Sequence, residues 1–399
     1  MPTSAKTILS PTRTTTAAWR PPHRPDLPPD PHRVDSVTTG STADGMSQQT
    51  DRINQNCRTP VLWITWEAHR RTRELAADLD IPLFEYNHPG SGWTRYPVLL
   101  FTTLRTLLAQ RPDTLIVQCP SIILGGWVSL FRRLLRYRLV VDCHNAAVLP
   151  SRYPFGFHPA LVRFIHRTAD VCWVTNTRLA DVIVKNGGHA LVLPDRVPSL
   201  GFAIPTDAPR GSRVTQEESG AGNGKTKPSV VFICSYASDE PYAEVIEAAR
   251  SLGAAIQWQI TGNTKRADPR LIRNLPPQVR LTGYLSESDY LALLARADVL
   301  VDLTLMDDCL LCGAYEAVAL GKPLVTSDTQ ALRDYFRQGA VYTKPDAASI
   351  ATAVSDALAR RASLASEMDA FRPVLTQEWR LQRDRVMDDL SRGRQRHGI

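Results

Sequence analysis

Short apolar stretches alternate with amphipathic ones along most of the chain. VLWIT (61–65), DTLIVQ (113–118) and YRLVVDC (137–143) have the length and composition of buried strands, and helix-forming segments separate them. Strands that alternate with helices predict a parallel sheet covered on both faces. We expect this first unit to span residues 57–198.

A polar, glycine-rich segment at 199–228 interrupts the alternation and predicts a flexible linker. The pattern resumes with SVVFICS (229–235) and continues to about residue 370, and a basic helix is expected over 371–399. The sequence therefore predicts two Rossmann-like, doubly wound α/β domains that face each other across a cleft. In open parallel sheets ligands bind at the carboxyl ends of the strands, so we expect the site in that cleft.

Residues 1–56 have a different composition from the rest of the chain. They are rich in Pro, Thr, Ser and Arg and show no hydrophobic period, so the segment is predicted to be disordered. Met46 lies just before the ordered region and is an alternative start.

Composition limits the class of protein and its partners. The 399 residues suit two domains, and the net charge of +7 favours a polyanionic partner or an anionic membrane surface. The seven cysteines are scattered, which is typical of a reduced, cytoplasmic protein. No apolar run is long enough to cross a membrane, and the first residues lack the apolar core of a signal peptide.

The stretch MDDCLLCGAYEAVALGKPLVTSD (306–328) holds the first candidate site. Asp308 and Glu316 stand eight positions apart around the predicted start of an apolar helix. The N–H groups of a helix start suit a phosphate, here at Leu311, Cys312 and Gly313, where the glycine permits a close approach. One acid would contact a sugar and the other a ribose. The alternative is an acidic helix start that complements the helix dipole, with Glu316 exposed.

The motif DCHN (142–145) supplies the second candidate site, at the end of a predicted buried strand. Asp142 and His144 there would position an acceptor or take the proton from its attacking hydroxyl. The alternative is a turn in which Asp142 and Asn145 hydrogen-bond local backbone.

Two features bear on the phosphates and on metals. Gly262 and Lys265 in TGNTK follow a predicted strand, and Lys265 is the nearest basic candidate for a phosphate contact. Cys309 and Cys312 form a C-x-x-C pair without the two further ligands that a zinc site needs. We therefore expect no metal ion and no resident cofactor.

The second half resembles the donor-binding domain of GT-B glycosyltransferases. It is similar to family 4, whose hallmark is two glutamates separated by seven residues; Asp308 and Glu316 occupy these positions, with Asp in place of the first Glu. ITGN (260–263), VRLTGYLSESDYLALLARADVLVDLT (279–304) and AVALGKPLVTSD (317–328) also match. The family usually holds the donor diphosphate with Arg and Lys where this chain has the acidic SYASDEPY (235–242).

The first half resembles another group of the same fold. VQCPSIILGGWVSLFRRLLRYRLVVDCHN (117–145) and FICSYASDEPYAEVIEAARSL (232–252) are similar to the β-1,4-mannosyltransferases that extend chitobiosyl-diphosphodolichol. The two resemblances imply transfer of a sugar from a GDP- or UDP-sugar to a lipid-linked or polysaccharide acceptor, at the inner face of a membrane. They point to opposite stereochemical outcomes, so retention and inversion both stay open.

Two other functions fit parts of the sequence. A non-hydrolysing nucleotide-sugar epimerase shares the two-domain fold and needs no acceptor. A basic nucleic-acid-binding protein fits the charge, but the arginines are spread out and no recognition motif is present, so we expect no nucleic-acid partner.

Two segments raise the question of membrane contact. The apolar stretch 121–138 ends in arginines and is either an interfacial helix or a core helix that covers the sheet. The basic residues of 380–397 would add attraction to anionic lipid.

Overall fold

The computed structural model describes residues 60–86, 94–119, 121–149, 158–199 and 227–397. These residues belong to one compact unit of the chain, Cys57–Ile399. The segment 1–56, predicted to be disordered, and nearly all of the predicted linker 199–228 lie outside the described residues.

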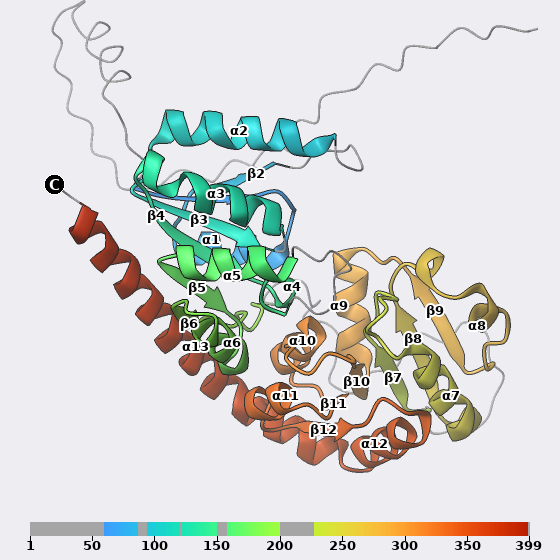
Figure 1. The fold of residues 1–399 in the computed structure, drawn as a ribbon. Coiled ribbons are helices and arrows are strands. Elements are labelled where there is room, and N and C mark those ends of the chain that lie inside the picture. Colours follow the sequence, from blue (N-terminus) through green and yellow to red (C-terminus); the bar gives the residue numbers. More distant parts are fainter. Residues whose placement is uncertain (1–59, 87–93, 120, 150–157, 200–226, 398–399) are drawn as a thin grey trace, which may run out of the picture. The chain divides into compact units, whose positions relative to one another are not determined.

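The first half forms a six-stranded parallel sheet in the order β2-β1-β3-β4-β5-β6 (Figure 1). Its strands are β1 (Val61–Thr65), β2 (Leu83–Glu85), β3 (Thr114–Cys119), β4 (Arg138–Cys143), β5 (Val171–Val174) and β6 (Ala190–Val192). Its helices are α1 (Arg70–Asp78), α2 (Arg95–Gln110), α3 (Ile122–Leu135), α4 (Asn145–Val148), α5 (His158–Thr168) and α6 (Thr177–Lys185). The predicted alternation and the parallel sheet are confirmed.

Alternate residues of each strand enter opposite cores, as the two-residue period of a strand requires. In β1, Leu62 and Ile64 pack with α2, α3, α5 and α6, while Val61 and Trp63 pack with α1 and the C-terminal helix. Trp63 meets Trp173 of β5 edge to face, with ring centroids 5.6 Å apart. Both faces of the sheet are therefore covered.

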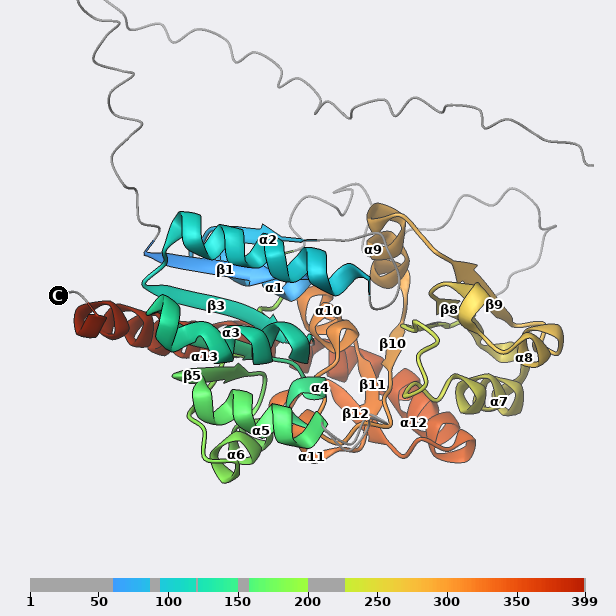
Figure 2. The same ribbon diagram turned by 45° about the horizontal axis from the view of Figure 1, so that its top comes forward.

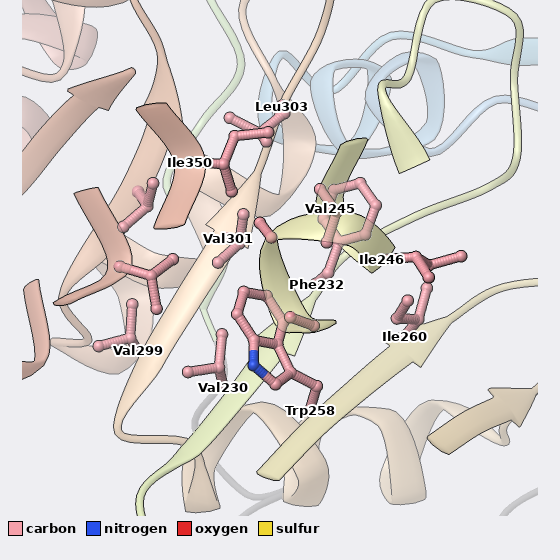
Figure 3. Close-up of a cluster of buried hydrophobic side chains, with 14 of the residues drawn as sticks. Val230, Phe232, Val245, Ile246, Trp258, Ile260, Val299, Val301, Leu303 and Ile350 are labelled. Atoms are coloured by element: carbon pink, nitrogen blue, oxygen red, sulfur yellow. The ribbon is translucent and has the colours of Figure 1, made fainter. Parts of the chain in front are cut away.

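The second half forms another six-stranded parallel sheet, in the order β12-β11-β10-β7-β8-β9. Its strands are β7 (Ser229–Phe232), β8 (Gln257–Thr261), β9 (Val279–Gly283), β10 (Val299–Asp302), β11 (Leu324–Ser327) and β12 (Ala340–Thr343). Its helices are α7 (Tyr242–Leu252), α8 (Pro269–Arg273), α9 (Glu287–Arg296), α10 (Cys312–Leu320), α11 (Gln330–Tyr335) and α12 (Ala347–Ala359). Figure 3 shows one of its cores, where Trp258 lies among aliphatic side chains.

The C-terminal helix differs from the prediction. It begins at Arg361, ten residues before the expected boundary of 371, and α13 runs to His397. Phe371 lies in a core of the second half, whereas Trp379 and Val386 lie in a core of the first half, where the Trp379 indole N–H donates to the Pro194 carbonyl at 3.1 Å. The helix is therefore an integral element that packs on both halves and not a separate basic tail.

Helix α3 supports the core-helix interpretation of 121–138 on its inner side. Leu124 and Val128 are fully buried against the sheet. Among the described residues, no helix combines the length and the apolar character needed to span a membrane.

Candidate active site

The two candidate acids lie at the carboxyl end of the second sheet. Asp308 is in the loop after β10, and Glu316 is in the second turn of α10, where every residue from Gly313 to Val318 is buried. The predicted loop and apolar helix are therefore confirmed. The alternative that leaves Glu316 exposed is wrong, because that residue is 4% exposed.

Both carboxylate oxygens of Glu316 have a partner. The Tyr290 hydroxyl on α9 donates to one at 2.5 Å, and the Arg70 guanidinium donates to the other at 3.1 Å. Burial raises the pKa of Glu316 above its usual value, and the hydrogen bond from Tyr290 and the charge of Arg70 oppose that shift. A carboxylate held in this way is oriented before any ligand arrives.

Asp308 also contacts the first half. Its side chain pairs with Arg178 of α6 at 2.5 Å, and its backbone carbonyl accepts from the Asn176 amide at 3.1 Å. Asn176 is at the same time the N-cap of α6, accepting from the Leu179 N–H at 3.1 Å. The loop that carries Asp308 is thereby joined to the start of a first-half helix.

These contacts bring together the carboxyl edges of the two sheets. Arg70 opens α1, which follows β1, and Arg178 lies in the first turn of α6, which follows β5. Each candidate acid thus pairs with an arginine placed at the carboxyl edge of the first sheet. Asp308 and Glu316, which were predicted for a site between the two domains, therefore both contact the first half.

The start of α10 holds an unexpected group. Asp302, at the end of β10, is 6% exposed and its Oδ2 has no hydrogen-bond partner among the described residues. A Cβ on Gly313 would lie 2.5 Å from that oxygen, so the glycine makes room for Asp302. Burial raises the pKa of Asp302 well above its usual value, against hydrogen bonds from the Ala314 and Gly313 N–H groups.

This arrangement changes the prediction for the phosphate. Leu311 is the N-cap residue of α10 and Cys312 is its exposed first residue, as a phosphate contact requires. The N–H groups of Gly313 and Ala314, however, serve Asp302. Any anion at this helix start has to share it with a carboxyl group whose neutral form is favoured.

The DCHN motif carries a buried ion pair. Asp142 has no exposed surface, and its Oδ1 accepts from the Arg71 guanidinium at 3.0 Å. Arg71 also pairs with Asp195 and donates to the Leu193 carbonyl at 2.7 Å. Burial alone would raise the pKa of Asp142, but the charge of Arg71 holds it well below its usual range.

His144 stands between this ion pair and the edge of the sheet. Its Nε2 lies 3.8 Å from Asp142 Oδ2 and 3.1 Å from the Gln118 amide nitrogen, and its side chain is 22% exposed. The His69 ring meets it edge to face at 4.6 Å. Burial and the neighbouring His144 lower the pKa of His69, which favours the neutral ring. Of the two candidates Asp142 and His144, only His144 has a side chain that a ligand could contact.

The acidic loop after β7 is folded around Glu240. Its carboxylate accepts from the backbone N–H groups of Ser235 and Ala237, both at 2.9 Å. Gly262 is required by close packing, because a Cβ there would lie 2.1 Å from the Cys234 carbonyl oxygen. Lys265 is exposed on the loop after β8, and no contact among the described residues links it to Glu316.

Sequence reasoning missed several partners in this site. The position of Arg70 directly after β1 is the signal that could have placed it at the carboxyl edge. Tyr290 and Arg178 carry no signal, since only the fold brings them to the acids.

Among the described residues no group of three or more His, Cys, Asp or Glu side chains is arranged to hold a metal ion.

Comparison with known proteins adds a family and a fold. Residues 227–360 match the family Glycosyl transferases group 1. No curated protein matches the sequence. Asp302, Asp308 and Glu316 all fall within the matched residues, whereas Asp142 and His144 lie outside them.

Solved structures share the arrangement of both halves. Anabaena HepE in complex with UDP is 13% identical, with a TM-score of 0.61 over 83% of this chain and 99% of that one. Sucrose-phosphate synthase from Thermosynechococcus elongatus is 16% identical, with a TM-score of 0.62 over 84% and 98%. A putative UDP-N-acetylglucosamine 2-epimerase from Listeria monocytogenes is 13% identical, with a TM-score of 0.50 over 77% and 82%.

At these identities the likeness shows the fold, which is GT-B: two α/β domains, each with a parallel sheet. The family match and this fold support a glycosyltransferase.

Proposed function

We propose that the protein transfers a sugar from a UDP- or GDP-sugar to a lipid-linked or polysaccharide acceptor. The observation that carries this proposal is Glu316, a buried and oriented carboxylate at the carboxyl edge of the matched glycosyltransferase domain. UDP is the first nucleotide to test, because the similar Anabaena structure contains UDP.

Each predicted residue has a place in this proposal. Glu316 accepts from the ribose hydroxyls, with the Arg70 contact exchanged for the ligand, and Asp308 faces the sugar. The diphosphate lies over Leu311 and Cys312 at the start of α10, which it shares with the Asp302 carboxyl group. Gly262 and Lys265 flank the donor from the loop after β8, and no metal or cofactor enters the proposal.

The transfer step needs one base at the acceptor. An acceptor oxygen forms the new bond to the anomeric carbon, and the bond from that carbon to the diphosphate oxygen breaks. The nucleoside diphosphate leaves with the electron pair, and His144 takes the proton of the acceptor hydroxyl. Asp142 acts through His144 as a positioning residue, since it is fully buried and paired with Arg71.

Nucleotide release tests this function and separates it from epimerisation. The full chain is incubated with UDP-glucose, UDP-N-acetylglucosamine or GDP-mannose, with and without a lipid extract or polysaccharide. We expect release of UDP or GDP that requires the acceptor. Conversion of the donor into an epimer without acceptor would overturn the transferase in favour of the epimerase. Turnover of every donor without acceptor would also overturn the transferase.

A further inference from the structure

Three helices of the first half carry apolar side chains on their outer surface. Helices α2, α3 and α5 lie next to one another over the same face of the first sheet (Figures 1 and 2). Their inner sides fill the core beneath. Their outer sides hold six of the eleven exposed large apolar side chains of the described residues, and these six define the outer face: Val98, Phe101, Leu108, Leu130, Leu134 and Phe164.

The exposed residues follow helical spacing and are not scattered. Val98, Phe101 and Leu108 recur along one side of α2, and Phe101 is 68% exposed. On α3, Leu130 and Leu134 are 67% and 74% exposed, one helical turn apart. A soluble protein gains nothing by presenting two adjacent apolar stripes to water, so such a patch indicates a surface that meets something apolar.

The α3 stripe is extended by aromatic side chains. Trp127 and Phe131 are half-buried on the same side as Leu130 and Leu134, and their ring centroids lie 5.0 Å apart. Aromatic side chains of this kind suit the boundary between headgroups and acyl chains.

The charges of the three helices have one sign. The segments α2, α3 and α5 contain no aspartate or glutamate, and they contain six arginines: Arg95, Arg105, Arg132, Arg133, Arg163 and Arg167. Four of these are exposed, and Arg132 pairs with Asp170. Helices α1 and α6 of the first half mix the signs, as α1 does with Glu74 and Asp78 beside its arginines.

We propose that the outer face of α2, α3 and α5 docks on an anionic lipid bilayer. Apolar side chains enter the interface, and the exposed arginines meet lipid phosphates. The absence of acids selects this occupant, because nothing on the three helices repels an anionic headgroup. All three helices are peripheral and none spans the bilayer.

The outer face adjoins the edge of the sheet at which the acceptor is proposed to react. Helix α3 begins directly after β3, so its start lies at the carboxyl edge where Gln118 contacts His144. A bilayer on the outer face therefore holds a membrane-anchored acceptor beside that edge. The choice of a lipid-linked acceptor over a polysaccharide rests on the proposed transfer, but the docking itself does not.

Vesicle flotation tests the docking with the full chain. Vesicles of phosphatidylcholine alone are compared with vesicles that also contain phosphatidylglycerol, at low and high salt. We expect flotation with the anionic vesicles that weakens with salt. The double variant Leu130→Ser, Leu134→Ser should lower partitioning about tenfold or more, and Arg105→Glu with Arg133→Glu should do the same.

Matched controls lie on the second half. Tyr284→Ser removes an apolar side chain that is 90% exposed, and Arg270→Glu reverses an exposed charge on α8, so both should float like the unchanged protein. Absence of flotation at low salt, equal flotation with neutral vesicles, or no effect of the outer-face variants would overturn the docking. A face that instead mediates self-association would also overturn it.

The two proposals fail in different ways. Loss of the docking leaves nucleotide release with a water-soluble acceptor intact, whereas loss of the transferase leaves flotation intact. Nucleotide release with a soluble acceptor should accordingly stay within about twofold of the unchanged protein in the outer-face variants, none of which lies in the candidate active site.

Discussion

Replacing Arg71 by leucine should lower the free energy of unfolding by about 3–5 kcal/mol, because it leaves Asp142 charged, buried and unpaired. Asp142 has no exposed surface, and Arg71 also serves Asp195 and the Leu193 carbonyl, so one substitution removes every one of these contacts. Chemical unfolding followed by circular dichroism measures the change.

A surface arginine of the same helix provides the control. Arg73 is 57% exposed and pairs with Glu85, so Arg73→Ala should cost at most about 1 kcal/mol. Adding Asp142→Asn to Arg71→Leu should recover part of the loss. An Arg71→Leu protein as stable as the Arg73→Ala protein would show that the buried cluster does not hold this half together.

The same pair predicts how stability depends on pH. The pKa of Asp142 is lower in the folded protein than in the unfolded chain, where it is about 4. Its stabilisation is therefore fully present above the unfolded pKa and is lost as the pH falls through the folded one. The Arg71→Leu, Asp142→Asn protein should lack this part of the acid sensitivity.

Replacing His144 by alanine should lower the rate of sugar transfer by about 10²–10⁴-fold, the usual contribution of a positioned general base. Nucleotide affinity should stay unchanged, because His144 lies on the first half and the nucleotide is proposed to bind to the second. Acceptor-dependent nucleotide release measures the first quantity, and titration of the nucleotide measures the second.

His189→Ala serves as the control, since His189 is exposed at the start of β6, at the opposite edge of the sheet. Its rate should match that of the unchanged protein. Transfer at the normal rate by His144→Ala would remove His144 from the chemistry, and an equal loss in both variants would indicate a structural effect.

Much of the fold follows from local patterns. Buried parallel strands such as β4 are continuous apolar runs, and their alternation with helices dictates the two sheets. Short elements at the end of the second sheet were harder to predict. Strand β12, AVYT, is only partly buried, and α11 has six residues, so neither has a strong period. The early start of α13 was missed because a single residue, Arg360, separates it from the end of α12.

The residues of the candidate site also fall into those that local sequence patterns locate and those that only the fold brings together. Asp308, Glu316 and His144 were found because each stands at the end of a strand or the start of a helix, which sequence patterns locate. Arg70 and Tyr290 reach Glu316 from elements far away in the chain, and only the packing of the two halves pairs them. Gly313 was predicted to permit the close approach of a phosphate, and the group that lies against it in the structure is the Asp302 carboxyl group. No local pattern indicates that contact.

The central claim is that Glu316 belongs to a nucleotide-sugar site, and calorimetric titration tests it most directly. UDP, GDP and their sugar conjugates are titrated into the unchanged protein, into Glu316→Ala, and into Glu247→Ala, whose carboxylate is 61% exposed on α7. We predict that one nucleotide binds, that Glu316→Ala weakens its binding at least about tenfold, and that Glu247→Ala does not change it. Binding that is the same in all three proteins would contradict the account, as would the absence of binding at millimolar nucleotide.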